Sequence, residues 1–170
     1  MTIQNVLQFG NPLLRESCIR VEYFDSPEVQ QTQRDLRDTL HRLQRVHRRG
    51  GGLAAPEIGS ALRIIYVHAR GRSFHLFNPV IVERSDETVQ AWDFCYSAQA
   101  SFLAEVTRSQ RIRVEYQDAS GNSHNETFEG YFSELLQHEI DHLNGTLFID
   151  HIDKPATLTM IAEWDRQHAL

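Results

Sequence analysis

The stretch LLQHEIDHLNG, residues 135–145, places a His-Glu-x-x-His pattern on a predicted helix. His138 and His142 are four residues apart, so both imidazoles would project from one face of that helix and could bind the same cation. Glu139 lies beside them, and in this pattern such a carboxylate takes a proton from water. The pattern favours a metal-dependent hydrolase. The alternative is that the pattern arises by chance and the two histidines are simply exposed on a polar helix face.

The length and the residue patterns predict a single α+β domain, residues 1–170. The chain has 170 residues, 41% of them hydrophobic, which is enough for one core. Ser26-Pro27-Glu28 predicts the start of a helix whose apolar pattern stops at Gly50, and Pro155 predicts a last helix through Trp164. Segments rich in β-branched and aromatic residues predict antiparallel strands at 62–67, 74–83 and 111–118, with turn residues at 119–123.

Charge and composition exclude several classes of function. The formal charge is −6, which opposes a broad nucleic-acid surface, and the arginines between Arg34 and Arg49 fit a solvated helix face. No stretch approaches the roughly 20 apolar residues of a membrane span, and the first residues do not resemble a signal peptide. We therefore expect a cytoplasmic protein that binds no specific nucleic acid and no membrane, in which Cys18 and Cys95 stay reduced.

A catalytic metal site usually needs a third protein ligand and keeps one position open for water. A histidine six residues after His142 would complete one known pattern, but Phe148 stands there. Glu163 is a downstream candidate, although it is more simply a polar position on the terminal helix. Cys95, in AWDFCYS (91–97), could supply a thiolate for a soft or borderline divalent metal, although such a cysteine is more often a small buried hydrophobe.

Three segments occur in the order typical of the peptide deformylase family, and the chain resembles that family over nearly its whole length. They are GGGLAAPE (50–57), DFCYS (93–97) and QHEIDH (137–142), against family patterns G-x-G-L-A-A-P-Q, E-G-C-L-S and Q-H-E-x-D-H. The flanking LQFGNPLLR and NGTLFIDH also resemble the family. The resemblance implies antiparallel β-sheets packed around a central helix that bears the His-Glu-x-x-His pattern.

The resemblance also implies a site and a reaction. Cys95, His138 and His142 would bind one divalent ion, Fe²⁺ or Zn²⁺, and the same ligands accept Ni²⁺ or Co²⁺. Glu139 would be the general acid/base, and the backbone N–H of Tyr96 would donate to the oxyanion together with the glutamine that ends the first motif. The implied reaction removes the formyl group from the amino-terminal methionine of a nascent peptide, with transient contact to the ribosome.

The residue in place of the family glutamine is Glu57. An ionised carboxylate cannot donate a hydrogen bond and would repel an oxyanion. Glu57 is therefore either held protonated in a catalytic role or used for a different task. A further alternative is that its side chain turns to solvent or pairs with an arginine.

The substrate cleft implied by the resemblance includes Gly50, Gly52, Leu53 and the position of Phe94, where the family has glycine. A phenyl group there should narrow the cleft, unless it folds into the core. Phe102 stands where the family usually has an arginine. We therefore expect this chain to bind metal as the family does but to recognise its substrate differently.

Three functions follow from these observations. The leading hypothesis is a metal-dependent hydrolase of the deformylase type that acts on formylated peptides. The second is a diverged relative that deacylates a different formylated or acylated amine, including a small molecule. The third is a catalytically silent domain that binds peptide ends. Glu57 and Phe94 favour the second or the third, whereas the unbroken QHEIDH and Cys95 favour catalysis.

Overall fold

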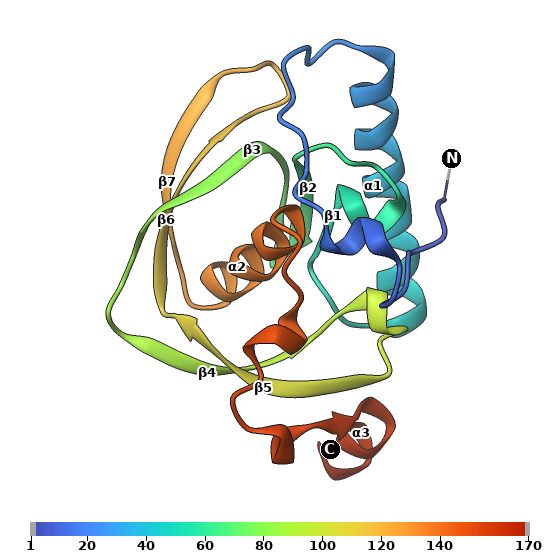
Figure 1. The fold of residues 1–170 in the computed structure, drawn as a ribbon, viewed down its shortest axis with the longest axis vertical. Helices are drawn as coiled ribbons and strands as arrows, with labels where there is room; N and C mark the ends of the chain where they lie inside the picture. The colour runs from blue at the N-terminus through green and yellow to red at the C-terminus, as the bar shows by residue number, and fades with distance from the viewer. Residues whose placement is uncertain (1–2, 169–170) are drawn as a thin grey trace.

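The helix that carries the two histidines, α2 (Tyr131–Leu143), lies at the centre of the molecule and contacts both of its sheets (Figure 1). The structure is a computed structural model and describes residues 3–168. The five-stranded sheet has the order β1 (Gly52–Ala54), β2 (Ile64–Ala69), β3 (Arg72–Arg84), β6 (Arg111–Gln117), β7 (Ser123–Glu129). The three-stranded sheet has the order β4 (Thr88–Phe94), β5 (Phe102–Ser109), β8 (Thr159–Met160). Every named pair is antiparallel, as predicted.

The first helix, α1, spans Pro27–His47, with Ser26 at its N-cap. The Ser26 hydroxyl accepts a hydrogen bond from the Val29 N–H at 3.3 Å, which satisfies one of the free donors of the first turn. Arg48 ends the helix in the left-handed conformation, with φ 56°. The predicted helix is therefore confirmed, and its arginines Arg34, Arg37, Arg42 and Arg45 are exposed.

The three predicted strands are confirmed as parts of β2, β3 and β6. Residues 118–122 join β6 to β7, and the Gly121 N–H donates to the Asp118 carbonyl at 2.9 Å in this turn, so the predicted turn at 119–123 extends one residue into β7. Short 3₁₀ helices connect other elements: η1 (Pro12–Arg15), η2 (Ala55–Ile58), η3 (Tyr96–Ala98), η4 (Phe148–His151) and η5 (Pro155–Thr157). Within residues 3–168, every helix is too short or too polar to span a bilayer.

The prediction of a continuous last helix from Pro155 is wrong. Pro155 opens only η5, and the chain then extends as β8 before α3 begins at Ile161 and runs to His168. Thr159 and Met160 pair with Leu103 and Phe102 of β5, and this pairing takes the backbone out of the helical conformation.

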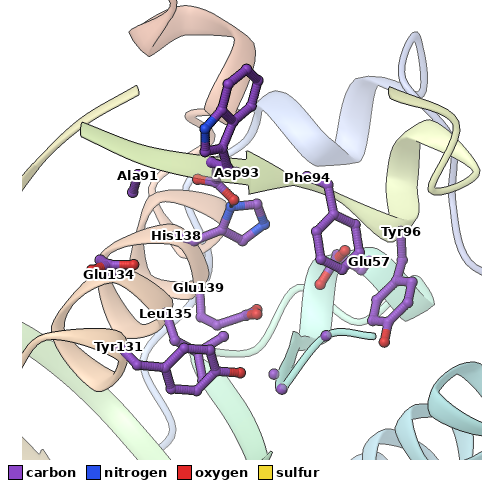
Figure 2. A pocket seen from close by; sticks show the side chains of 14 residues that line it. Glu57, Ala91, Asp93, Phe94, Tyr96, Tyr131, Glu134, Leu135, His138 and Glu139 are labelled. Carbon is purple, nitrogen blue, oxygen red and sulfur yellow. Dashed lines mark ion pairs between the residues drawn. The ribbon is translucent and has the colours of Figure 1, made fainter. Parts of the chain in front are cut away.

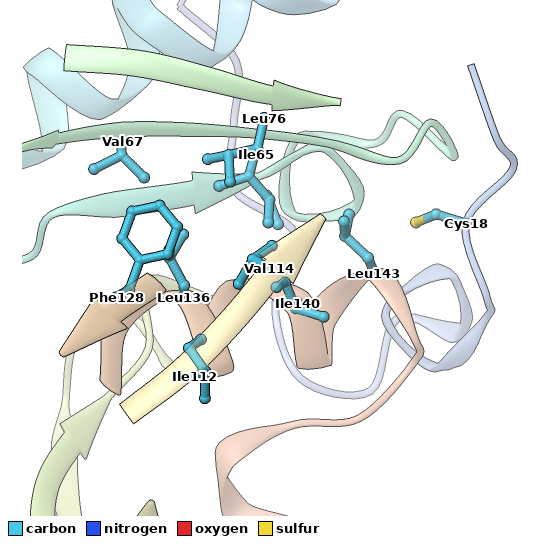
Figure 3. Close-up of a cluster of buried hydrophobic side chains, with 11 residues drawn as sticks. Cys18, Ile65, Val67, Leu76, Ile112, Val114, Phe128, Leu136, Ile140 and Leu143 are labelled. Carbon is cyan, nitrogen blue, oxygen red and sulfur yellow. The ribbon is translucent and has the colours of Figure 1, made fainter. Parts of the chain in front are cut away.

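Two cores lie on opposite faces of the five-stranded sheet because successive side chains of a strand alternate between faces. Ile65 and Val67 of β2 face α2, in the cluster that Figure 3 shows. Ile64 and Tyr66 face α1. The first cluster also holds Leu136, Ile140 and Leu143 of α2, and this packing fixes the orientation of the helix that carries the histidines.

Candidate active site

Cys95, His138 and His142 converge in the interior. Cys95 follows β4 and is the N-cap of η3, while the two histidines come from successive turns of α2. Their ligand atoms all lie within 4.8 Å of one another, and the Cys95 sulfur is 3.2 Å from Nε2 of His142. All three residues are buried, so the alternative of two exposed histidines is wrong. Glu163 lies on α3, where it pairs with Arg166 at 2.7 Å, and is not part of this group.

The donor set fits a divalent metal of borderline softness, because it combines one sulfur with two imidazole nitrogens. The three ligand atoms are close enough to share one cation, and all three side chains are buried. Burial, together with the charge of Glu57, raises the pKa of the Cys95 thiol to about 12. Burial lowers the pKa of His142 to about 4. His142 is therefore neutral at physiological pH, the form that binds metals.

A chain of ion pairs leads from His138 to the surface. Nδ1 of His138 lies 2.9 Å from Oδ1 of Asp93, a short contact whose N–H is not aligned as in an ideal hydrogen bond. The other Asp93 oxygen accepts from Arg108 at 2.9 Å, and Arg108 also donates to Asp141 at 2.6 Å. Asp141 is in turn 2.9 Å from Nε2 of His151. A carboxylate behind a metal-binding histidine fixes its ring orientation.

These charges also shift pKa values. Burial would lower the pKa of His138, but Asp93 and Cys95 together outweigh burial and raise this pKa well above its ordinary value. Burial would raise the pKa of Asp93, but His138 and Arg108 lower it to about 2. The sequence did not point to Arg108, Asp141 or His151, and Asp93 entered only as the first residue of the DFCYS segment, where the family pattern has glutamate. The one available signal was the expectation that a ligating histidine has a carboxylate partner.

Glu139 lies on the wall of a pocket between α2, β4 and the glycine loop at residues 50–52 (Figure 2). Its side chain is only 3% exposed, and its Oε2 atom has no hydrogen-bond partner among residues 3–168. Burial and the neighbouring Glu57 raise the pKa of Glu139 well above its ordinary value. A Cβ atom at Gly52 would lie 2.5 Å from Oε1 of Glu139, so glycine is required for the observed approach of β1 to this carboxylate.

The pocket has a volume of about 130 Å³ and brings most of the predicted cleft residues together. Gly50, Gly52, Phe94 and Tyr96 line it. The Phe94 ring packs edge-on against Tyr96 at 5.7 Å between centroids, so it narrows the cleft and does not fold entirely into the core. The prediction for Leu53 is wrong, because its side chain is fully buried against the α1 side of the sheet, opposite to the face of Gly52.

Glu57 is buried beside the cysteine, so the alternative in which it turns to solvent or pairs with an arginine is wrong. Its Oε2 accepts a hydrogen bond from the Ala54 N–H at 2.9 Å. Its Oε1 accepts from the Ser97 hydroxyl at 3.2 Å and from the Cys95 thiol at 3.4 Å. The carboxyl group therefore acts as an acceptor for three donors of the site.

Phe102, at the position of the family arginine, packs in an aromatic cluster with Phe9 and Phe148. Ring centroids are 6.4 Å apart for the pair with Phe9 and 5.6 Å apart for the pair with Phe148. This cluster also contains Cys95, so Phe102 supports the cysteine loop from behind and places no cation near the pocket.

Comparisons with known proteins identify the family of the chain. The family model described as polypeptide deformylase matches residues 3–157. A peptide deformylase of Desulfotalea psychrophila is 36% identical over 158 residues, which cover 89% of each chain. The crystal structure of peptide deformylase from Thermotoga maritima has a TM-score of 0.82 and 34% identity, and the match covers 91% of this chain and 100% of that one.

A class I type b peptide deformylase from Acinetobacter baumannii, solved with bound Met-Ala-Ser, has a TM-score of 0.79 and 26% identity, and the match covers 89% of this chain and 99% of that one. The family match spans most of the chain, and the fold and the sequence agree on it. The chain therefore belongs to the polypeptide deformylase family, metal-dependent hydrolases that remove the N-formyl group from nascent peptides.

Proposed function

We propose that Cys95, His138 and His142 hold the one divalent cation on which deformylation depends in this chain, and that Glu139 moves the proton. The observation that carries this proposal is the convergence of three buried ligand atoms, all within 4.8 Å of one another, next to a pocket wall that presents the carboxylate of Glu139. Both parts of the arrangement are needed, since hydrolysis requires an activated water and a place for its proton.

When bound, such a cation lowers the pKa of a coordinated water toward neutrality and polarises a carbonyl. Glu139 takes the proton of the attacking water and returns it to the departing amine. Its raised pKa suits a group that must hold this proton between the two steps. The backbone N–H of Tyr96, which has no acceptor inside η3 because it is the first residue of that helix, is the proposed donor to the oxyanion.

Glu57 takes a different part from the glutamine of the family. With the Ala54 N–H and the Ser97 hydroxyl directed at its carboxyl group, Glu57 orients these two groups as an acceptor, and the Cys95 thiol donates to it only while no cation is bound. In that state it offers no hydrogen bond to the substrate. Oxyanion stabilisation then rests on the cation and on the Tyr96 N–H, and we expect this chain to be slower on formyl-methionyl peptides than a protein with the amide.

The remaining features of the function belong to the same proposal. The ion is Fe²⁺ or Zn²⁺, and the Cys-His-His set also accepts Ni²⁺ or Co²⁺. The substrate is a formylated peptide or a small formylated amine. The peptide bound to the A. baumannii relative supports a peptide amino terminus in the pocket. Residues 1–170 form one domain that acts in the cytoplasm, in transient contact with the ribosome.

The test is turnover of formyl-Met-Ala-Ser by protein loaded anaerobically with Fe²⁺ or Zn²⁺, with metal content measured on the same sample. Glu139→Gln should keep the metal and lose about 10²–10⁴ in kcat. Glu129→Gln, which makes the same change on an exposed strand, is the control. An active Glu139→Gln protein would remove this residue from the mechanism. Turnover of another formylated amine, with none of the peptide, would support the diverged relative that Glu57 and Phe94 favour.

A further inference from the structure

The last helix, α3, contacts both walls of the pocket from the outside. It runs from Ile161 to His168, and Figure 1 shows it in red below β5. All eight of its residues remain at least partly exposed, so core packing contributes little to its position. The position of α3 therefore depends on a few side-chain contacts.

The first contact joins α3 to the wall of the pocket that β4 provides. The ring centroids of Trp164 and Trp92 lie 4.4 Å apart, and Trp92 is one of the residues that line the pocket. Ile161, one turn earlier on α3, packs against the hydrophobic cluster that includes Phe94 and Tyr96. These two residues also line the pocket. The helix thus supports this wall from behind.

The second contact joins α3 to the opposite wall. Both carboxylate oxygens of Asp165 accept hydrogen bonds from one guanidinium nitrogen of Arg49, each at 2.7 Å. Arg49 immediately precedes the glycine loop at residues 50–52, and its carbonyl accepts a hydrogen bond from the Tyr96 hydroxyl. Its guanidinium lies 6.0 Å from the centroid of the Phe94 ring. Arg49 thus connects α3 to the glycine loop and to the ring that narrows the cleft.

We propose that α3 is a strap that holds the two walls of the substrate cleft at a fixed separation, with Trp164 and Asp165 as positioning residues. This inference rests on the proposed function, which places the peptide in the pocket. The glycine loop leads into β1 of the five-stranded sheet, whereas Phe94 ends β4 of the three-stranded sheet, and α3 is bound to both. While α3 is docked, the cleft is preorganised. After its release the peptide has to order Arg49 and Phe94, so the affinity for the peptide falls.

The docking of α3 can be measured spectroscopically. The chain has two tryptophans, Trp92 and Trp164, and both belong to the contact between α3 and β4. Two indole rings 4.4 Å apart couple electronically and give a pair of circular-dichroism bands of opposite sign. These bands disappear when the rings separate, because the coupling falls steeply with distance. The position of the strap can therefore be followed without any turnover.

The test uses the zinc-loaded protein and three readouts: the paired tryptophan bands, the Kd of Met-Ala-Ser by calorimetry, and kcat and KM on formyl-Met-Ala-Ser. Asp165→Arg places two guanidinium groups against each other, so α3 should leave its position. We expect the bands to disappear, kcat to stay within about twofold, and Kd and KM to rise about tenfold, as they would with roughly one molecule in ten still docked. Trp164→Ala, which removes the other contact, should raise Kd and KM in the same direction. Glu163→Gln is the matched control, because Glu163 lies on the same helix but pairs with Arg166, and it should leave all three readouts unchanged.

The reciprocal double variant, Arg49→Asp with Asp165→Arg, restores the pair with exchanged charges and should restore the bands, Kd and KM. A rise in KM that this exchange does not reverse would overturn the strap, because Arg49 would then act on the peptide itself. Bands that persist in Asp165→Arg, or a Kd and KM that stay unchanged after the bands are lost, would also overturn it. Absence of turnover in every variant, together with weaker binding of Met-Ala-Ser to Asp165→Arg, would overturn the proposed function and leave the strap standing.

Discussion

Replacing Gly52 by alanine should disable Glu139 without changing its carboxylate. The added Cβ would lie 2.5 Å from Oε1 of Glu139 and 2.8 Å from its Cγ. Ordinary contact begins at 3.4 Å, so the carboxylate would have to retreat from 2.5 to 3.4 Å, about 0.9 Å, or β1 would have to move away from α2. A displacement of about 1 Å at a reacting group costs on the order of 10²-fold in rate. We therefore expect Gly52→Ala to lose about 10²-fold in kcat.

Gly51→Ala is the matched control, with the same methyl group added one residue earlier. Its Cβ would meet the hydroxyl of Tyr131 at 2.2 Å, and no atom of Glu139 is among its nearest neighbours. The far end of a tyrosine can swing aside, and Tyr131 lines the pocket, so Gly51→Ala should alter KM more than kcat. Both variants should lose about 1–3 kcal/mol of unfolding free energy, the usual range for overpacking.

The assay is kcat and KM on formyl-Met-Ala-Ser, with metal content and urea unfolding measured on the same preparations. A loss of kcat in Gly52→Ala with full metal content would support the reasoning. It would be refuted by wild-type kcat in Gly52→Ala, because Glu139 would then act from a displaced position. Equal losses in the two glycine variants would also refute it, because a general distortion of the loop would explain both.

Three further predictions concern other parts of the molecule. Cys95→Ser should weaken metal binding by more than about 10²-fold, because even the loss of a residue that only hydrogen-bonds a ligand can lower metal affinity by up to about 10²-fold. Unchanged absorption of the cobalt-loaded variant would contradict the thiolate assignment. Glu57→Gln should raise kcat/KM on formyl-Met-Ala-Ser by about 10²-fold, because the amide supplies an oxyanion donor; loss of activity would show that the carboxylate has a positive role. Burial lowers the pKa of His75 to about 4, so the unfolded chain binds more protons between pH 6.5 and 4, and stability falls as the pH drops through that window. His75→Phe should remove roughly 2 kcal/mol of the loss between pH 7 and 4.5, measured by urea unfolding, and an unchanged pH slope would contradict this.

Helix α1 and the strands β2, β3 and β6 could be predicted because their signals are local. Ser26 and Pro27 mark the helix start, and β-branched residues mark the strands. Strands β1, β4, β5, β7 and β8 were not predicted. Two of them, β1 and β8, have only three and two residues and depend on their partners. The helix predicted from Pro155 was wrong for the same reason, because pairing with β5 decides the conformation of the residues after Pro155.

The candidate site likewise has one part that local sequence spacing predicts and another that it does not. The histidines are four residues apart on one helix, so their convergence could be predicted from spacing alone. The contact of His138 with Asp93 and the ion pairs of Arg108 join α2 to a separate sheet, and no local pattern encodes them. The direction of the Glu57 side chain also depends on contacts made by Cys95, 38 positions later in the chain.

The three proposed ligands connect the three-stranded sheet to the central helix, and this has a consequence for the motions of the protein. Cys95 follows the three-stranded sheet, whereas the histidines lie on the helix packed against the five-stranded sheet. A cation held by all three would couple ligand binding to the docking of the two sheets, and each tenfold excess of free ion over its Kd would add about 1.4 kcal/mol to stability. Separation of the sheets and escape of the ion would then be a single event, so the dissociation rate of the metal would report the slowest breathing motion of the fold, and the amide protons of β4 and β5 would exchange at that rate.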